Sequence, residues 1–296
     1  ELEDGRVLID AIASWWTACH GYQHPHLVHA MRNQLETMSH VMLGGLTHDP
    51  ALLLAQKLSH LLPNPLNHVF FTDSGSVAVE AALKMVLQYW INQGKPSRHH
   101  FIHFKDAYHG DTFFAMSVCD PEEGMHHLFK DRLPKQFLQD IPKDEHHLKA
   151  YESFLNQNHE KIAGLIIEPL VQGAGGMKFH SPDMLNELIR LTQSYDLPVI
   201  FDEIFTGFGR TGSLFAFNQC EVIPDIICLG KGLTGGMTPL AATVASSKIF
   251  EAFYSNEPNK TFMHGPTFTG HALGCQAALA SLELFETEPR LEQARA

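Results

Sequence analysis

The chain has 296 residues, of which 44% are hydrophobic and 18% are charged. This composition excludes a disordered chain, because enough apolar side chains are present to form a core. No apolar run approaches the roughly 20 residues that span a bilayer, so no membrane-spanning segment is expected. Lys and Arg number 21 against 33 Asp and Glu, a formal net charge of −12 with no basic cluster. Nucleic-acid binding is therefore not expected as a main function.

Cysteine usage and the first residues bear on the cellular compartment. The five cysteines are odd in number and widely spaced, and they contain no C-x-x-C pair. This pattern predicts neither a disulfide framework nor a zinc ribbon, and it favours a reducing cytoplasm. Residues 1–4 are acidic where an export signal is basic and then apolar, so no such signal is expected.

Both ends of the chain carry incomplete patterns. Asp4-Gly5 is a strong signal for a tight hairpin turn, and it predicts a strand over residues 6–10. Only three residues precede this turn, and no initiating Met is present. At the other end, residues 290–296 follow Pro289 and resemble the start of a helix that is cut short. These patterns predict that the chain is a fragment of a longer protein.

Strand and helix patterns alternate between these ends. Apolar residues at helical spacing predict helices that start at Pro25, after Asp49-Pro50, after residue 76 and at Pro182. Short apolar runs predict buried strands at 69–71, 101–104, 165–167, 199–201 and 226–229. Buried strands separated by amphipathic helices imply a mostly parallel sheet in an α/β domain. Ligands of such sheets bind at the carboxyl ends of the strands.

Five of the predicted strand ends carry polar or small residues. These are residues 73–76, residues 105–110, Glu168, Asp202-Glu203 and Lys231. Each of them alone has a simpler explanation, because loops are polar in any protein. Lys231 lies between two glycines directly after an apolar strand, where partial burial makes a lysine a better nucleophile toward an aldehyde.

Two further features complete a candidate cofactor site. Asp202 ends the preceding strand, so the sheet brings it to the edge that holds Lys231, where a carboxylate can pair with a protonated pyridine nitrogen. Gly75-Ser76 at a helix start offers N–H groups, a hydroxyl and the positive end of the helix dipole, which suits a phosphate. An amine, a carboxylate and a phosphate cradle together predict a pyridoxal phosphate (PLP) site.

Two other motifs point elsewhere. Residues 207–212 match the dinucleotide pattern G-x-G-x-x-G, but the segment before Pro224 is too short for the helix that this pattern requires. His99, His100 and His103 suggest a metal, yet they straddle a loop and a strand without an H-E-x-x-H motif. The sequence therefore predicts neither a nicotinamide site nor a metal site.

The motifs around Asp202 and Lys231 resemble the signature of class III PLP-dependent aminotransferases. They are D-E-I at 202–204, T-G-F-G-R-T-G at 206–212 and L-G-K-G-L at 229–233. The resemblance implies a PLP-dependent transferase fold of type I: a mostly parallel central sheet with helices on both faces, plus a small α+β domain that is incomplete here. It implies residues 1–40 as the N-terminal part of the small domain, 41–288 as the large PLP-binding domain and 289–296 as the start of the C-terminal part.

Further motifs resemble one branch of this class. They are S-W-W at 14–16, H-V-M at 40–42, D-S-G-S-V-A-V-E at 73–80, Y-H-G-D-T at 108–112, M-S-V-C-D-P at 116–121 and H-G-P-T-F at 264–268. This branch transfers an amino group from S-adenosyl-L-methionine to 8-amino-7-oxononanoate, giving 7,8-diaminononanoate in biotin biosynthesis. Other class III enzymes, which use ornithine, acetylornithine or 4-aminobutyrate, remain an alternative. An inactive fragment is a second one, because the family places further substrate contacts beyond both ends of this chain.

The resemblance also implies roles for residues in the matching motifs. Lys231 would form the Schiff base with the cofactor and carry the catalytic proton. Asp202 would hold the pyridinium nitrogen, and Gly75 and Ser76 would hold the phosphate. Tyr108 would cover the cofactor ring and border the substrate, which Lys231 also contacts.

The resemblance implies roles for four residues of the S-W-W and H-G-P-T-F motifs as well. Trp15 and Gly265 would line the substrate pocket, where an aromatic wall can attract the sulfonium cation of the donor. Pro266 and Thr267 would reach the phosphate of the neighbouring subunit. A shared site of this kind implies a homodimer.

Overall fold

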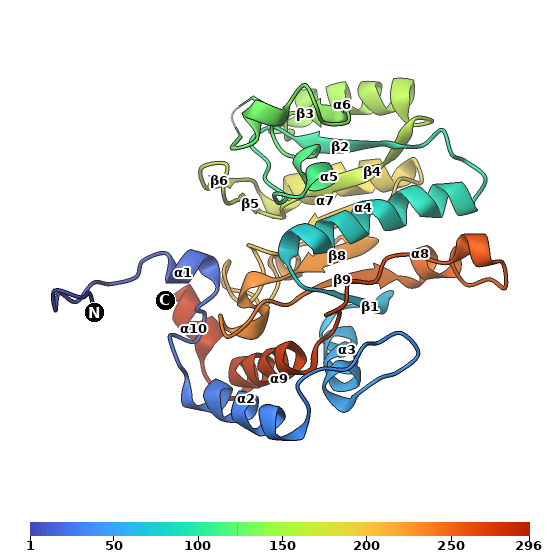
Figure 1. Ribbon diagram of the computed structural model, residues 1–296. Coiled ribbons are helices and arrows are strands. Elements are labelled where there is room, and N and C mark those ends of the chain that lie inside the picture. Colours follow the sequence, from blue (N-terminus) through green and yellow to red (C-terminus); the bar gives the residue numbers. More distant parts are fainter. Residues whose placement is uncertain (123) are drawn as a thin grey trace.

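A computed structural model describes residues 1–122 and 124–296 and shows a central sheet with helices on both faces (Figure 1). The sheet has seven strands in the order β1-β9-β8-β7-β4-β2-β3. Their bounds are β1 (Leu66–Thr72), β2 (His100–Phe104), β3 (Phe137–Gln139), β4 (Ile162–Ile167), β7 (Val199–Asp202), β8 (Ile226–Leu229) and β9 (Ala241–Ser246). A separate antiparallel pair is formed by β5 (Val171–Gln172) and β6 (Lys178–Phe179).

The sheet is mostly parallel, as predicted. Strands β8, β7, β4, β2 and β3 run parallel to one another, whereas β9 is antiparallel to both β1 and β8. The sequence did not predict β9, because its small residues A-A-T-V-A-S lack the bulky apolar run of the other strands. All six residues of β9 are buried, so neighbouring strands and helices supply the packing.

Helices cover both faces of the sheet. The longer ones are α2 (Pro25–Thr37), α3 (Asp49–Leu61), α4 (Gly75–Asn92), α6 (Glu145–Asn158), α7 (Pro182–Ser194) and α9 (Ala272–Thr287). The shorter ones are α1 (Ala13–Trp16), α5 (Phe113–Met116), α8 (Ser247–Glu251) and α10 (Arg290–Arg295), with 3₁₀ turns at η1 (His127–Phe129), η2 (Ala216–Gln219), η3 (Lys231–Thr234) and η4 (Pro258–Lys260). None of the helices in the described ranges combines the length and the apolarity required to cross a membrane.

Alternate residues of each central strand point to opposite faces and enter two different cores. In β7, Val199 and Phe201 join the core that contains residues of α3, α6, α7 and α9. Ile200, between them, joins the core formed with α4. Because the strands are buried on both faces, their register is fixed, and so are the positions at which each strand ends and its loop begins.

The predicted helices are confirmed, with local differences. Pro25 and Pro182 begin α2 and α7, and His24 and Ser181 cap them. Leu27 of α2 is buried against Ala280 and Leu284 of α9. The segment assigned to the small domain therefore packs on a helix assigned to the large domain, and the domain limits remain a prediction.

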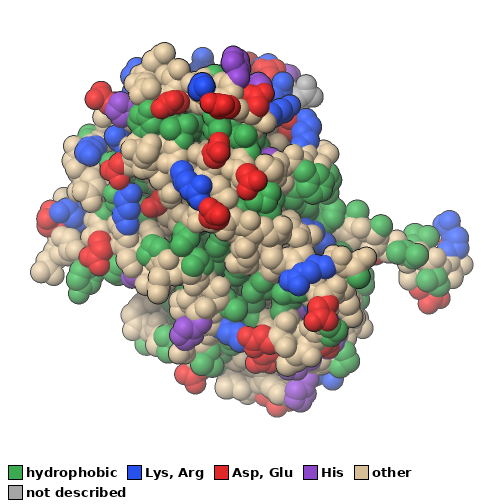
Figure 2. Space-filling view, turned by 180° about the vertical axis from the view of Figure 1, so that it is seen from behind, with side chains coloured by type: hydrophobic (Ala, Val, Ile, Leu, Met, Phe, Trp, Pro, Cys, Tyr) green, Lys and Arg blue, Asp and Glu red, His purple; other side chains and the backbone are tan. Residues whose placement is uncertain are grey.

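The predicted strand at residues 6–10 is wrong. Asp4-Gly5 does form a turn, in which the Gly5 N–H donates to the Leu2 carbonyl at 2.9 Å. Residues 6–10 are not a strand, and Val7 and Ile9 are 81% and 95% exposed. The turn signal is local, whereas a strand needs a partner, and the described chain offers none here. This segment extends away from the rest of the molecule (Figures 1 and 2).

Candidate active site

The carboxyl ends of β7 and β8 bring two candidate residues to one edge of the sheet. Asp202 is the last residue of β7 and lies opposite Cys228 of β8. Gly230 follows the end of β8, and Lys231 then begins the turn η3 with a φ of 44°. This left-handed conformation is uncommon for a lysine, and such strain tends to occur where the surrounding structure holds a residue for function.

Asp202 is held rigidly inside the protein. Its side chain is buried, and its Oδ2 lies 2.7 Å from Nδ1 of His109, whose side chain is buried as well. Its Oδ1 accepts the backbone N–H of Ile204 at 3.1 Å. An ionised carboxylate only accepts hydrogen bonds, so Nδ1 of His109 carries the proton that it donates. Both oxygens of Asp202 are thus oriented by neighbours.

Lys231 lies in a largely desolvated environment. Burial lowers its pKa below the ordinary value of 10.5, whereas the charges of Asp202 and Glu168 act in the opposite direction. Its Nζ lies 5.7 Å from the ring centroid of Phe205, and that ring meets the Trp16 ring edge-on at 5.0 Å. A lowered pKa favours the neutral amine, which is the nucleophilic form of lysine.

Glu168 connects the loops after β2 and β4. It is buried, and it accepts the N–H of Tyr108 at 3.2 Å and the N–H of Gly173 at 2.9 Å. Burial raises its pKa to about 7. Glu168 thereby positions the backbone that carries Tyr108 and His109.

The start of α4 and the loop at 110–111 form a close contact at the proposed phosphate cradle. Ser74, not Ser76, caps the helix by accepting the N–H of Val77 at 3.3 Å, so the hydroxyl of Ser76 has another role. Ser76 Oγ accepts the N–H of Asp111 at 3.0 Å. A Cβ on Gly75 would approach Ile204 to 2.9 Å, which explains why a glycine begins this helix.

Tyr108 borders this region. Its hydroxyl donates to Asp111 Oδ1 at 2.9 Å, and its ring stacks on His126 with centroids 5.9 Å apart. Burial, followed by the bond to Asp111, raises the pKa of Tyr108, so its hydroxyl stays protonated at neutral pH. Tyr108, Ser76 and Asp111 therefore form one connected group.

The other predicted site residues make no hydrogen bond or ion pair with Lys231 within the described ranges, although α1, which contains Trp15, lies against the turn η3 that begins at Lys231. Trp15 is 76% exposed and lies in α1, where Ala13 to Trp16 all have positive φ. Gly265 is exposed with open space around it, and Thr267 is exposed as well. Their roles, like those of the residues above, remain predictions.

Phe205 was not selected from the sequence. His109 and Glu203 were included in the candidate strand ends, but no role was predicted for either of them. Glu203 is buried and accepts the N–H groups of Ala216 and Phe217 at 3.0 and 2.8 Å, and it thereby anchors the loop that resembles a dinucleotide motif. A buried acid directly after Asp202 is the signal that could have identified this anchor. His109 lies in the quoted Y-H-G motif, but its pairing with Asp202 depends on tertiary structure.

A pocket of about 560 Å³ lies elsewhere, near the carboxyl end of β2. Lys105, Asp140, Gln172, Lys178 and His180 are among the residues that line it. Lys105 and Asp106 of the candidate strand end at 105–110 line it, whereas Asp202, Lys231, Gly75, Ser76 and Tyr108 do not. The candidate catalytic residues at the ends of β7 and β8 therefore lie outside this pocket.

The whole chain, residues 1–296, matches the class-III aminotransferase family. This chain belongs to that family. PLP is the cofactor of class III aminotransferases, as the resemblance implied.

Relatives with a shared name are similar over almost the entire chain. Adenosylmethionine-8-amino-7-oxononanoate aminotransferase of Corynebacterium glutamicum is 47% identical over 294 residues, which cover 97% of this chain and 69% of the relative. The protein of that name from Buchnera aphidicola subsp. Schizaphis graminum is 45% identical over 293 residues, which cover 97% and 67%. The chain thus spans about two thirds of the length of these relatives.

Solved structures confirm the fold. The crystal structure of adenosylmethionine-8-amino-7-oxononanoate aminotransferase from Methanocaldococcus jannaschii superposes with a TM-score of 0.94 at 37% identity, covering 98% of this chain and 67% of that one. A PLP-bound amine transaminase from an uncultivated Pseudomonas species has a TM-score of 0.91 at 32% identity, covering 97% and 68%. The chain therefore has the PLP-dependent transferase fold.

The residues at the strand ends fit this cofactor. The oriented carboxylate of Asp202 suits a protonated ring nitrogen. The lowered pKa of Lys231 suits a covalent partner for an aldehyde. Gly75 and Ser76 form the first turn of α4, where helix-start N–H groups and the helix dipole favour a phosphate.

Proposed function

We propose that this chain transfers an amino group from S-adenosyl-L-methionine to 8-amino-7-oxononanoate, giving 7,8-diaminononanoate in biotin biosynthesis. Bound PLP supplies an electron-accepting ring to this reaction. Identity of 45–47% to relatives named for these substrates supports the choice of substrates. The buried pair of His109 and Asp202, at the same sheet edge as Lys231, carries the proposal that the chemistry is PLP-dependent transamination.

Each proposed residue has a role that its surroundings favour. Lys231 would hold the cofactor through its amine and move the proton at the substrate α-carbon. Asp202 would keep the ring nitrogen protonated by placing a fixed negative charge beside it. Gly75 and Ser76 would hold the phosphate at the first turn of α4, and Tyr108 would cover the ring. Trp15 would face the sulfonium group of the donor, on the order of 1–2 kcal/mol of cation–π attraction, and Gly265 would border the same pocket.

A homodimer is part of the proposal. Gly265 and Thr267 are exposed, and Pro266 is half-buried between them. Within the described ranges, no hydrogen bond or ion pair joins this segment to Ser76 or Lys231. We infer that Pro266 and Thr267 reach the phosphate bound to a second copy. The expected mass in light scattering is twice that of the chain, and a monomer that still binds PLP with full affinity would contradict this arrangement.

The choice of amino donor is tested by half-reactions. The PLP-loaded protein is mixed separately with S-adenosyl-L-methionine, ornithine, acetylornithine and 4-aminobutyrate, and the loss of cofactor absorbance is followed. S-adenosyl-L-methionine is expected to discharge the cofactor fastest. Discharge by ornithine or 4-aminobutyrate, with none by S-adenosyl-L-methionine, would refute the substrate proposal but leave the transaminase in place.

A second candidate function is that of an amine transaminase. It rests on the PLP-bound amine transaminase that superposes with a TM-score of 0.91 at 32% identity. The same half-reactions with simple primary amines test it. Rapid discharge by such amines and slow discharge by S-adenosyl-L-methionine would favour this candidate.

A further inference from the structure

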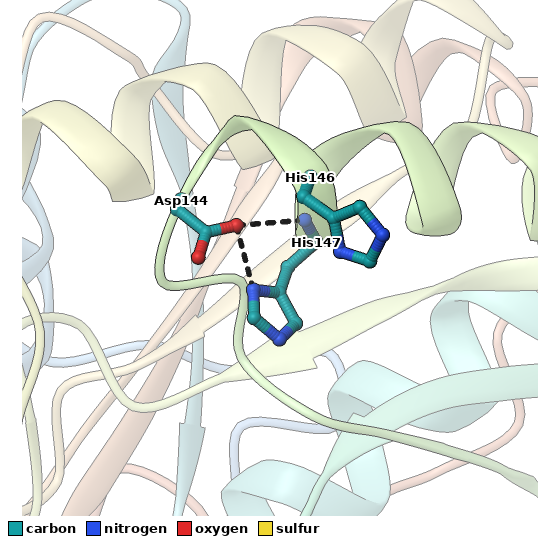
Figure 3. A group of neighbouring side chains, drawn as sticks. All are labelled: Asp144, His146 and His147. Atoms are coloured by element: carbon teal, nitrogen blue, oxygen red, sulfur yellow. Dashed lines mark hydrogen bonds and ion pairs between the residues drawn. The ribbon is translucent and has the colours of Figure 1, made fainter.

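A group of three metal-ligating side chains lies at the start of α6, away from the proposed active site. Asp144, His146 and His147 come from the end of the loop after β3 and the first turn of this helix (Figure 3). One potential ligand atom of each lies within 4.8 Å of the others, and all three residues are exposed. Of the histidines, only His99, His100 and His103 suggested a metal from the sequence, and the group at the start of α6 was not predicted.

Asp144 and His147 require only a small change to bind a cation, whereas the ligand atom of His146, within 4.8 Å of the other two, must come closer by up to about 1.5 Å through rotation of its exposed side chain. Asp144 Oδ1 lies 2.7 Å from Nδ1 of His147 (Figure 3). Two ligands at about 2.05 Å in a tetrahedral zinc site lie roughly 3.3 Å apart. A cation can therefore take the place of the proton that Asp144 and His147 now share, if the distance between their two ligand atoms increases by about 0.6 Å. The imidazole stays neutral in this exchange, because its proton moves to Nε2.

His146 supplies the third ligand from the other side. Its ring lies 5.6 Å from the ring of His147, centroid to centroid, and at 88° to it. Figure 3 shows the ring of His147 beside the carboxylate of Asp144, and the ring of His146 on the opposite side of the His147 backbone. Two imidazoles and one carboxylate form a ligand set found in zinc sites, with water completing the coordination of an exposed ion. The imidazoles select zinc-like cations over Mg²⁺ and Ca²⁺, which prefer oxygen ligands.

One feature opposes the site, and its size can be estimated. The N-terminus of a helix carries a partial positive charge, which repels a cation by an amount comparable with a single surface ion pair. The ionised Asp144 offsets this charge, and Glu145, which lies 2.8 Å from Lys149, adds a second negative charge to the same turn. Coordination by two imidazoles is a much stronger effect than the dipole.

We propose that Asp144, His146 and His147 form a surface binding site for a divalent transition metal ion of the zinc type. The site joins the loop before α6 to the first turn of that helix. Its function is independent of transamination, because it shares no residue with the group around Lys231. Bound metal stabilises the folded chain, since the unfolded chain lacks the arrangement of the three ligands.

The experiment titrates Zn²⁺ into the purified chain without an affinity tag, in competition with a chromophoric chelator. The wild-type chain is expected to bind one ion that the variants His146→Ala and His147→Ala do not. Asp144→Asn is expected to weaken the affinity about tenfold or more, since even a second-shell change has effects of that size. An Asn side-chain oxygen still accepts the N–H of His147 and caps the helix, so this variant separates binding from folding.

Matched controls and spectra complete the test. His60→Ala and His99→Ala remove other exposed histidines and are expected to retain the site. Co²⁺ in place of Zn²⁺ is expected to give an absorption spectrum without a thiolate charge-transfer band, which excludes the free cysteines as ligands. Zn²⁺ is also expected to raise the thermal midpoint of the wild-type chain and not that of His146→Ala. The proposal would be overturned by the absence of a saturable site in the wild type or by a thiolate band. It would also be overturned if the Asp144 and His146 variants bound Zn²⁺ as tightly as the wild type does.

Discussion

The imidazole of His109 and the carboxylate of Asp202 form a buried pair with Nδ1 and Oδ2 2.7 Å apart. The backbone N–H of His109 donates to Cys119 Sγ at 3.1 Å, which fixes the backbone of the loop after β2. Two loops after non-adjacent strands of the sheet are thereby joined at the carboxylate that we propose to face the cofactor nitrogen. In the proposed arrangement His109 would be a positioning residue, because it would act on the cofactor through Asp202.

His109→Asn is expected to weaken PLP binding about tenfold. A hydrogen bond to a charged group contributes roughly 1.5–3 kcal/mol, and 1.4 kcal/mol corresponds to a factor of ten. The measurement is a fluorescence titration of the chain with PLP, with the exposed His99→Asn as the control. Wild-type PLP affinity in a correctly folded His109→Asn chain would show that Asp202 needs no such partner.

Lys231→Ala is expected to abolish transamination and leave the fold intact, because the change removes a nucleophile and not a core side chain. Turnover and far-UV circular dichroism measure the two effects, and Lys105→Ala, an exposed lysine also found after a strand, serves as the control. Borohydride reduction of the PLP-loaded wild type is expected to leave a pyridoxyl group on Lys231 alone. Undiminished turnover in the variant would contradict the proposed mechanism.

The sequence predicted the elements whose signals are local. Buried strands with bulky apolar residues and helices with Pro at the first turn, such as α2 and α7, lie where expected. The strand at 6–10 failed and β9 was missed, because pairing depends on partners that are remote in sequence. Even within α2, apolar spacing did not determine burial, since Leu27 is buried whereas Leu35 is 58% exposed.

The candidate site divides in the same way. Asp202 and Lys231 could be predicted from sequence, because both follow apolar strands and the parallel sheet brings such ends to one edge. The pairing of His109 with Asp202 could not, since 93 residues separate them and nothing local in either segment signals the contact. Trp15 and Thr267 illustrate a third class, in which a family motif assigns a role that contacts within one chain do not test.

Acidification is expected to destabilise the fold through His103. This residue of β2 is buried, and burial lowers its pKa from 6.5 to about 3. Below pH 6.5, His103 binds a proton in the unfolded chain but stays neutral in the folded chain. Its contribution to the free energy of unfolding therefore falls as the pH falls toward 3. At pH 5 this single group lowers the free energy of unfolding by about 2 kcal/mol relative to pH 7.

Urea unfolding at pH 7 and pH 5 measures this effect. Glu168 and Glu203, with pKa values raised to about 7 by burial, act in the opposite direction, so the prediction concerns the difference between variants. Relative to the wild type, His103→Gln is expected to make the change in the free energy of unfolding from pH 7 to pH 5 more favourable by about 2 kcal/mol, whereas the exposed His60→Gln is expected to retain the wild-type change. His20 and His180 are also buried enough for their pKa to fall to about 4, so part of the pH dependence stays in the His103 variant. An unchanged difference in the His103 variant would assign acid sensitivity to other groups.

Gly110→Ala is expected to impair the proposed phosphate cradle more than backbone strain alone explains. Gly110 has a φ of +119°, and a Cβ there would lie 2.5 Å from Ser76 Oγ and 2.8 Å from Ser76 Cα. The loop would have to move away from α4, which breaks the bond from the Asp111 N–H to Ser76. Overpacking of this kind costs about 1–3 kcal/mol, so PLP affinity is expected to fall about tenfold or more.

Gly176→Ala provides the matched control for this prediction. Gly176 has a φ of +99°, but no atom lies within 4 Å of the position that its Cβ would take. Both variants therefore incur backbone strain, and only Gly110→Ala adds a collision with the first turn of α4. A PLP titration of the two variants isolates the collision as the difference between their affinities. If both bind PLP equally well, the close contact between Gly110 and Ser76 does not shape the phosphate site, and Ser76 loses its main structural support as a ligand.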